Sequence, residues 1–180
     1  MPSNKRAEPQ AEKRAQLVAA ARELFVRDGY ESTPMGRIAQ AAGVTPNTIY
    51  WYFEDKDELL LAVINELFQE NLAEFMGVAG RPLAEQLFWL VQKLKGFNRL
   101  ISTVHARVGE SKALDQWHSQ FHITVEQLFG MQLPRGIAKQ SIAAEVRIAA
   151  FTIEGLVTHA IDESAIRFTC EALASRWTKA

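Results

Sequence analysis

Apolar residues recur at intervals of three and four along almost the whole chain, which is the spacing that gathers them on one face of a helix. From Ala11 to Asp28 the apolar positions keep this spacing, and Gly29 follows where helices commonly end in a left-handed residue. No stretch alternates apolar and polar residues with the β-branched side chains typical of strands. The pattern therefore predicts an all-α fold.

Two short helices are expected next, each beginning at a Thr-Pro pair, Thr33-Pro34 and Thr45-Pro46. A threonine hydroxyl can accept a free backbone N–H at a helix start, and proline costs nothing at the first helical position. The first helix should end at Gly43, and the second should run through Phe53. The Gly43-Val44 turn would join them closely.

A longer helix is predicted after Asp55, because Asp55 and Glu58 resemble a capping box. It should run to about Met76, where Gly77 and Gly80 mark a boundary. Five further helices are predicted at residues 82–95, 98–108, 111–129, 139–162 and 164–178, which gives about nine helices in all.

The second short helix carries more outward-facing polar and aromatic residues than a two-turn helix needs for folding. Two short helices joined by a glycine turn form the helix-turn-helix arrangement, whose second helix lies in the major groove of DNA. Tyrosine and threonine hydroxyls bind phosphates, and an asparagine can pair with adenine. In the alternative interpretation Tyr50 and Tyr52 only fill space, since this geometry also occurs in proteins that never contact DNA.

Residues 43–59, GVTPNTIYWYFEDKDEL, resemble the helix-turn-helix signature of the TetR family of bacterial transcriptional regulators. Residues 19–25, 29–30 and 33–42 resemble the family's first two helices, so the likeness covers roughly residues 11–62. It implies a flexible basic arm at residues 1–10, a three-helix DNA-binding domain at residues 11–55, and a helical ligand-binding and dimerisation domain at residues 56–180.

The resemblance also implies roles for single residues. It places Tyr50 and Lys56 on phosphates and Asn47 on a base, while Gly36 departs from the base-reaching side chain that is common at its position, so that Arg37 supplies a phosphate contact instead. The candidate DNA-binding residues are Thr33, Arg37, Thr45, Pro46, Asn47, Thr48, Tyr50, Trp51, Tyr52 and Lys56.

One short recognition helix offers few base contacts, so we expect a homodimer on palindromic double-stranded DNA. The family resemblance implies that the last two helices pair with those of a partner. The candidate interface residues are Val146, Ile153, Val157, Ile161, Leu173 and Trp177. Alternatively these residues complete the core of one chain, because periodicity does not distinguish a core from a partner.

Aromatic and histidine residues are concentrated in the middle helices, and aromatic walls with a few polar groups are typical of small-molecule cavities. The resemblance implies a pocket for a hydrophobic inducer. The candidate lining residues are Phe88, Trp89, Phe97, His105, Trp117, Phe121, His122 and Phe151. The same residues are also typical of an ordinary core.

Asp115, His118 and His122 fall on one helical face at spacings that can hold a divalent cation. Because three polar residues on one face are common and no second set of ligands is evident, we expect neither a metal nor a cofactor. Cys170 lies in an apolar helix, which favours a buried, inert thiol.

The composition excludes several classes of protein but does not by itself indicate a function. With 180 residues, 48% of them hydrophobic, and a net charge of -1, the chain is neither disordered nor broadly cationic. Its single cysteine allows no internal disulfide, and the apolar stretch at residues 142–161 is interrupted by charged residues. We expect a cytoplasmic protein with no membrane partner.

The sequence therefore predicts a ligand-responsive transcriptional repressor that binds its operator as a homodimer and is not an enzyme. The alternative is an all-helical small-molecule carrier, or a metal-dependent enzyme that uses the aromatic cavity.

Overall fold

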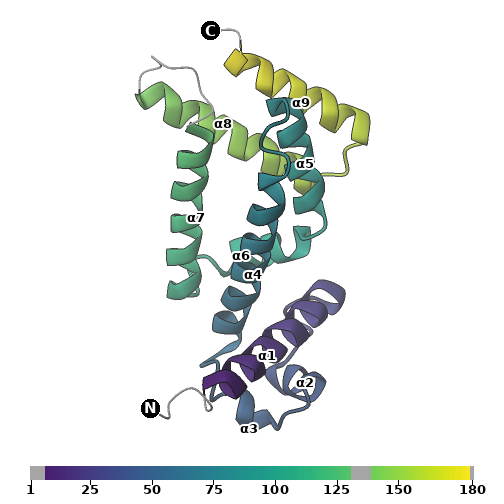
Figure 1. The fold of residues 1–180 in the computed structure, drawn as a ribbon, viewed down its shortest axis with the longest axis vertical. Coiled ribbons are helices and arrows are strands. Elements are labelled where there is room, and N and C mark those ends of the chain that lie inside the picture. The colour runs from purple at the N-terminus through teal and green to yellow at the C-terminus, as the bar shows by residue number, and fades with distance from the viewer. Residues whose placement is uncertain (1–6, 131–138, 179–180) are drawn as a thin grey trace. The chain divides into compact units, whose positions relative to one another are not determined.

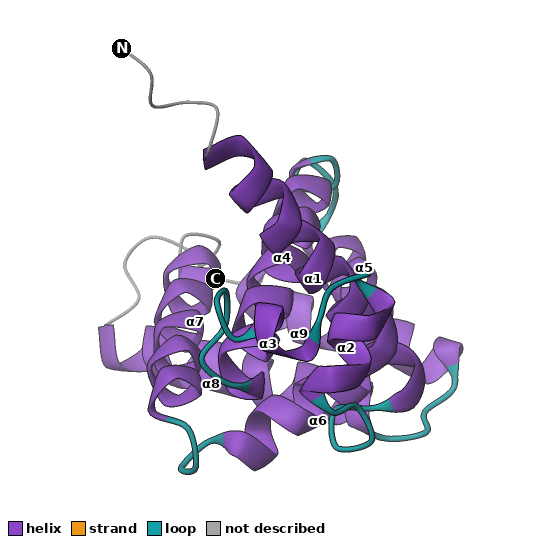
Figure 2. Ribbon diagram, turned by 90° about the horizontal axis from the view of Figure 1, so that it is seen from below, coloured by secondary structure: helices purple, strands orange, loops and turns teal. Residues whose placement is uncertain are grey.

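The structure is a computed structural model that describes residues 7–130 and 139–178. Within these ranges every regular element is an α-helix, and short loops join the helices (Figure 2), which confirms the predicted all-α fold. The helices are α1 (Ala7–Asp28), α2 (Met35–Ala41), α3 (Pro46–Ile49), α4 (Lys56–Met76), α5 (Leu83–Lys95), α6 (Asn98–Arg107), α7 (Lys112–Gly130), α8 (Lys139–Thr158) and α9 (Glu163–Thr178).

Helix α3 is shorter than predicted and ends at Ile49 instead of Phe53. The amides of Trp51 and Tyr52 bond to the carbonyls three residues before them, at 3.1 and 3.0 Å. This tighter pattern is typical of a turn that follows a helix. As a result, the three aromatic residues after Ile49 are carried by a turn and not by the helix itself.

Two other helix ends also differ from the prediction. Helix α8 ends at Thr158 and not at residue 162, because the carboxylate of Asp162 accepts the Ala165 amide at 2.9 Å and so caps α9. Helix α1 begins at Ala7, inside the arm predicted at residues 1–10, of which residues 1–6 lie outside the described residues.

The chain divides into two compact units. The first unit comprises Met1–Gln69 and Arg99–Trp117, and the second comprises Glu70–Asn98 and His118–Ala180. The boundary predicted between residues 55 and 56 falls inside the first unit, so the division into a DNA-binding and a ligand-binding domain stays a prediction about function.

The core of the first unit is built from α1, α2 and the start of α4. Leu17, Phe25, Ile38, Leu59 and Val63 are almost completely buried. Burying a side chain of this size stabilises a fold by about 1.5–3 kcal/mol. Helix α2 packs against both α1 and α3, as Figure 1 shows at the purple end of the chain. This packing sets the position of α3 relative to the core of the first unit.

In the second unit, α5 packs against both α8 and α9 (Figure 1). This packing revises the predicted dimer interface. Val146, Ile153, Val157, Leu173 and Trp177 are each at most 6% exposed in the single chain, and Ile161 is half-buried. The five buried residues complete the core of their own unit, which is the alternative that periodicity left open.

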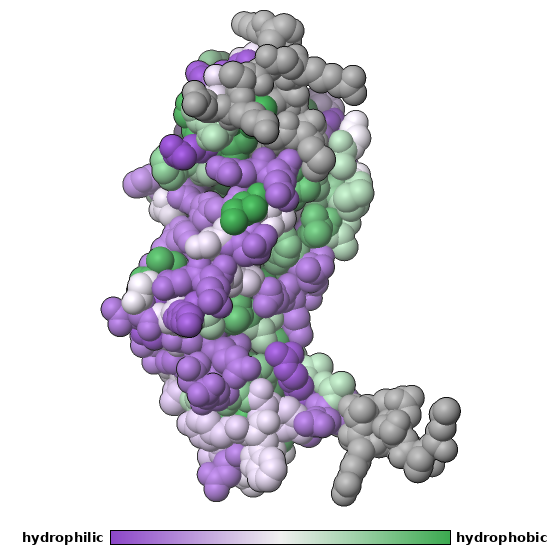
Figure 3. Space-filling model, turned by 90° about the vertical axis from the view of Figure 1, so that its left-hand side faces the viewer, coloured by the Kyte–Doolittle hydropathy of each residue, from purple (hydrophilic) through white to green (hydrophobic). Residues whose placement is uncertain are grey.

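No helix in the described residues has both the length and the apolar character needed to cross a membrane. On the face that Figure 3 shows, hydrophilic residues predominate and apolar residues are scattered among them. Single exposed apolar residues are normal on protein surfaces.

Candidate nucleic-acid interface

The turn between α2 and α3 is closed by backbone hydrogen bonds. Gly43 adopts φ 66°, a left-handed conformation that favours glycine, and the Val44 amide donates to the Ala39 carbonyl at 2.9 Å. Thr45 then caps α3, since its Oγ1 accepts the Thr48 amide at 3.3 Å with Pro46 at the first helical position. The predicted cap at Thr45 is thereby confirmed.

The side chains around α3 divide sharply by burial. Ile49 and Phe53 are at most 1% exposed and anchor the segment in the core of the first unit. Tyr50 is 56% exposed and Trp51 is 85% exposed. We use the name recognition ridge for five exposed residues, Thr45, Pro46, Asn47, Tyr50 and Trp51, together with the half-buried Thr48 and Tyr52. Large aromatic side chains left in water offer surface that a partner can cover.

Thr33 is not part of this exposed surface. Its side chain is fully buried, and its hydroxyl donates to the Gly29 carbonyl at 2.8 Å. The residue that caps α2 is Pro34, which offers no side-chain hydrogen bond. The structure therefore corrects the prediction that Thr33 caps α2 and contacts a phosphate: its hydroxyl instead closes the loop after α1.

Arg37 is exposed on α2 but is already engaged with a carboxylate. Its Nη2 lies 2.7 Å from Oδ2 of Asp28, and Arg27 donates to Oδ1 of the same carboxylate at 2.9 Å. The hydrogen bond from Arg27 is the main cause that lowers the pKa of Asp28. A phosphate contact by Arg37 stays a prediction, and it would compete with Asp28.

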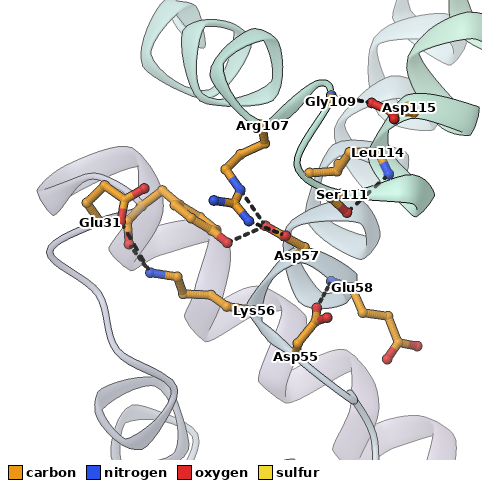
Figure 4. A network of polar contacts seen from close by, with 11 residues as sticks. Glu31, Asp55, Lys56, Asp57, Glu58, Arg107, Gly109, Ser111, Leu114 and Asp115 are labelled. Atoms are coloured by element: carbon orange, nitrogen blue, oxygen red, sulfur yellow. Dashed lines mark hydrogen bonds and ion pairs between the residues drawn. The ribbon is translucent and has the colours of Figure 1, made fainter.

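Lys56 begins α4, and its ammonium is turned toward the loop after α1. Its Nζ donates to the Tyr30 carbonyl at 3.0 Å and lies 4.0 Å from the centre of the Tyr30 ring. Glu31 lies on its other side at 4.0 Å (Figure 4). The side chain is 21% exposed, so a contact between Lys56 and a phosphate requires the side chain to leave these partners.

A partly buried polar cluster lies next to Lys56, and no local sequence pattern predicts it. The carboxylate of Asp57, in the first turn of α4, accepts the Tyr30 hydroxyl and two hydrogen bonds from Arg107 of α6 (Figure 4). The Arg107 Nε and Nη2 lie 3.1 and 2.7 Å from the two oxygens, which is the paired geometry that binds carboxylates most strongly. We call Tyr30, Asp57 and Arg107 the Asp57 cluster.

The cluster changes the titration of its own members. Burial alone would raise the pKa of Asp57, but the hydrogen bonds from Arg107 and Tyr30 outweigh it, so the pKa lies below its ordinary value. Burial, and then the hydrogen bond to Asp57, raise the pKa of Tyr30 far above its ordinary value. The cluster therefore holds a carboxylate, a neutral phenol and a guanidinium at neutral pH, and it joins α4, α6 and the loop after α1.

The predicted cap by Asp55 at the start of α4 is confirmed, while the carboxylate of Glu58 bonds one residue earlier than in a standard capping box. The Glu58 amide donates to Asp55 Oδ1 at 2.8 Å, and the Glu58 carboxylate accepts the Glu54 amide at 2.6 Å. These acidic side chains satisfy free amides at the helix start.

The residues predicted to line a ligand pocket are divided between the two units. His105 and Trp117 belong to the first unit, where Trp117 Nε1 donates to Asn65 Oδ1 at 2.8 Å. The other six residues belong to the second unit: Phe88, Trp89, Phe97, Phe121, His122 and Phe151. Five of them are half-buried. Phe151 is 65% exposed, so its place in a pocket lining is corrected to a place on the surface of α8.

Partners are visible for several of these residues. The centre of the Phe88 ring lies 4.0 Å from the Arg167 guanidinium, and the Trp89 and Phe75 rings contact each other tilted by 51°, with their centres 5.9 Å apart. Of the predicted metal candidates, Asp115 accepts the Gly109 amide at 2.7 Å (Figure 4). Its carboxylate thus closes the turn before α7.

Comparison with known proteins finds a family that matches residues 17–63. Residues 17–63 match the sequence model described as bacterial regulatory proteins, tetR family. The HTH-type transcriptional regulator AcrR of Shigella flexneri is 44% identical over 63 residues, which are 35% of this chain and 29% of that protein. The alignment thus covers less than a third of that relative.

Solved structures extend the likeness in fold to nearly the whole chain. A transcriptional regulator from Rhodococcus sp. Rha1 superposes with a TM-score of 0.77 at 19% identity, covering 92% of this chain and 96% of that one. The regulator FadR from Bacillus subtilis in complex with stearoyl-CoA gives 0.65 at 21% identity, covering 89% and 97%. Residues 17–63 therefore resemble the tetR family of bacterial regulatory proteins, and the solved structures show that the chain shares their fold.

Proposed function

We propose that this chain is a transcriptional regulator that binds double-stranded DNA through the recognition ridge. The observation that carries the proposal is the exposure of Trp51 and Tyr50, at 85% and 56%, on a segment whose other side is anchored by buried Ile49 and Phe53. A rigid ridge of hydroxyl, amide and aromatic groups can enter a major groove without first becoming ordered.

The ridge offers both kinds of contact that sequence-specific binding needs. The Tyr50 hydroxyl can donate to a phosphate, which positions the helix on the duplex. The Thr45 and Thr48 hydroxyls lie 2.8 Å apart and share one hydrogen bond, so one of the two can also donate to a phosphate. Asn47 is exposed at the start of α3 and can make a paired hydrogen bond with adenine. We therefore assign positioning to the hydroxyls and base reading chiefly to Asn47 and Trp51.

The test begins with selection of binding sites from a library of random DNA duplexes. We expect enrichment of a palindromic motif, with affinity that falls steeply as salt rises, since phosphate contacts release counterions. The double variant Tyr50→Ala/Trp51→Ala should enrich nothing, and Ile123→Ala, which removes an exposed apolar side chain of α7, should behave as wild type. Equal enrichment by the double variant would refute the proposal.

We further infer that the regulator acts as a homodimer through exposed faces of α8 and α9. Ile148 and Phe151 lie one turn apart on α8, at 42% and 65% exposure, and Phe168 of α9 is 72% exposed. Gly155 lies one turn beyond Phe151 on the same face of α8, and the space beside Gly155 is open. A palindrome requires two recognition ridges, about 34–36 Å apart or a multiple of that. A second copy that covers these residues would supply the second ridge.

Sedimentation measurements distinguish this interface from the one expected from sequence. Phe151→Glu should convert a dimer to a monomer, because it places a charge in the middle of an apolar contact. Its far-UV circular dichroism should stay unchanged, since the side chain is exposed in the single chain. Glu110→Lys, which changes an exposed charge in the turn before α7 and outside α8 and α9, serves as the control. A variant that remains dimeric would exclude this face.

The finer part of the proposal is repression relieved by a hydrophobic small molecule. Support comes from the half-buried aromatic residues Phe88, Trp89, Phe97 and Phe121 in the second unit, and from the stearoyl-CoA that FadR of Bacillus subtilis binds in its structure. Stearoyl-CoA is therefore the first probe, with coenzyme A as its control. A ligand that binds only the folded chain should raise its melting temperature and lower its affinity for the selected DNA. Unchanged melting and DNA affinity with stearoyl-CoA would remove the support that FadR provides for this ligand class.

A further inference from the structure

Two histidines of α7 lie one helical turn apart with their reactive nitrogens facing each other. His118 and His122 both belong to the second unit, and their Nε2 atoms are 3.1 Å apart. Residues four apart on a helix lie side by side, so the helix itself keeps the two rings together. The proposed DNA-binding function uses neither of them.

The orientation of the rings is fixed by packing as well as by the helix. The two imidazoles meet edge to face with their centres 4.5 Å apart, and Phe121 packs edge-on against His122 at 5.7 Å. All three side chains are half-buried. Rings held in this way lose little freedom when they bind a ligand.

We propose that His118 and His122 form a chelating site for a divalent transition-metal ion such as Zn²⁺, Ni²⁺ or Cu²⁺. Imidazole nitrogen is a preferred ligand of these ions, with bonds of about 2.0–2.1 Å to zinc. Two nitrogens that are 3.1 Å apart and bound at that length subtend an angle of about 100° at the ion. This angle lies between the octahedral and the tetrahedral values, so the separation of the two nitrogens suits such an ion. The ion lies to one side of the line that joins them, so each ring must turn by about 40° to aim its lone pair at the ion.

Metal binding requires a change of tautomer together with a rotation of the two rings. Where the two Nε2 atoms share a hydrogen bond, one carries the proton and the other offers its lone pair. When the ion takes the place of the shared proton, that proton moves to Nδ1 of the same ring and both rings stay neutral. Both Nε2 lone pairs then point at the ion, and water completes its coordination.

Calorimetric titration of the full chain with Zn²⁺, after removal of any affinity tag, tests the site. We expect one ion per chain, and we expect His118→Gln and His122→Gln each to weaken binding at least about tenfold, because one ligand remains and the chelate is lost. His159→Gln removes an exposed histidine outside α7 and should change nothing. Mg²⁺, which prefers oxygen ligands, should not bind with comparable affinity.

Melting temperature provides a second measurement that does not depend on heats of binding. Zn²⁺ should raise the melting temperature of wild type and His159→Gln, but not of the two α7 variants, by mass action on the folded state. Circular dichroism establishes that each variant is folded before titration. Equal Zn²⁺ affinity in wild type and His122→Gln, or an equal loss in His159→Gln, would overturn the proposal. Neither measurement contains DNA, so its outcome is independent of the proposed regulatory function.

Discussion

The recognition ridge and Asp57, the centre of the Asp57 cluster, lie within a dozen residues of each other in the sequence but differ in what their side chains contact. Trp51 is 85% exposed, so folding buries little of its surface. The Asp57 side chain is 11% exposed and accepts hydrogen bonds from Tyr30 and Arg107. The exposed side chains of the ridge are available to a partner, whereas the polar groups of the cluster bond to one another and hold α4 in place. Mutations in the cluster should therefore act on stability, and mutations in the ridge on binding.

The largest expected effect is the loss of stability on replacing Asp57 by alanine. Without the carboxylate, the guanidinium of Arg107 and the hydroxyl of Tyr30 lose their partner. Breaking a buried ion pair in this way costs about 2–3 kcal/mol, near the lower end of the usual range because the Arg107 side chain is 31% exposed and regains some water. Urea denaturation measures the change in the free energy of unfolding.

Asp55→Ala is the matched control for this prediction. It removes an acid two positions away that only caps α4, so its cost should be about 1 kcal/mol. If Asp55→Ala and Asp57→Ala lost equal stability, the Asp57 cluster would contribute no more than an exposed helix cap.

The next largest effect should come from Tyr50→Ala, and on DNA affinity alone. A hydrogen bond from a hydroxyl to a charged phosphate contributes about 1.5–3 kcal/mol, which corresponds to roughly 10- to 100-fold in affinity. Because tyrosine is neutral, the dependence of affinity on salt should keep its slope. Fluorescence anisotropy on the selected duplex, at several salt concentrations, measures both quantities.

Tyr50→Phe separates the hydroxyl from the ring. If the phosphate contact is real, the phenylalanine variant should lose most of what the alanine variant loses. If Tyr50→Phe binds as wild type, the ring and not the hydroxyl makes the contact. Asn47→Ala is expected to differ from both, by changing the preferred base pair at one position by about 1–3 kcal/mol.

The same comparison explains which features could be predicted from the sequence. Thr45, Asp55 and Glu58 cap helices through hydrogen bonds to residues three or four positions away, and such local chemistry is visible in the sequence. Arg107 pairs with Asp57 across 50 positions, and nothing in the residues near either one indicates the other. Only the packing of α6 in the first unit brings them together.

Burial was the other property that the sequence did not specify. Thr33 and Thr45 stand in the same Thr-Pro context, yet one is fully buried and the other is exposed. On α8, Val146 and Ile148 are equally apolar, but Val146 is 2% exposed and Ile148 is 42% exposed. Helical periodicity identifies apolar positions, and the packing against α5 decides which of them remain for a partner.

A smaller effect is expected from pH, and it again concerns the Asp57 cluster. Because the pKa of Asp57 is lowered in the folded chain, the cluster contributes stability above the ordinary pKa of an aspartate and loses it as pH falls through the folded-state value. Asp57→Asn removes this dependence. The difference in the free energy of unfolding between wild type and Asp57→Asn should therefore be largest near neutral pH and shrink toward pH 3, a range set by the ordinary aspartate pKa of about 3.9.

Urea denaturation at a series of pH values measures this difference. Asp55→Asn serves as the comparison, because it shares the residue type and lies outside the cluster. If the difference in the free energy of unfolding between wild type and Asp57→Asn stayed constant down to pH 3, the charge of Asp57 would contribute nothing to stability.

The smallest effect should be the local loosening of α3 in Thr45→Ala. The hydroxyl of Thr45 accepts the Thr48 amide at 3.3 Å, and losing a cap of this kind costs about 1 kcal/mol. Since Ile49 and Phe53 still anchor the segment, global stability should change little while the Thr48 amide exchanges faster with solvent. Hydrogen exchange followed by NMR measures that amide directly. Thr45→Ser keeps the capping oxygen and should exchange as wild type; if it exchanged as fast as Thr45→Ala, the rigidity of the ridge would come from its anchors and not from its cap.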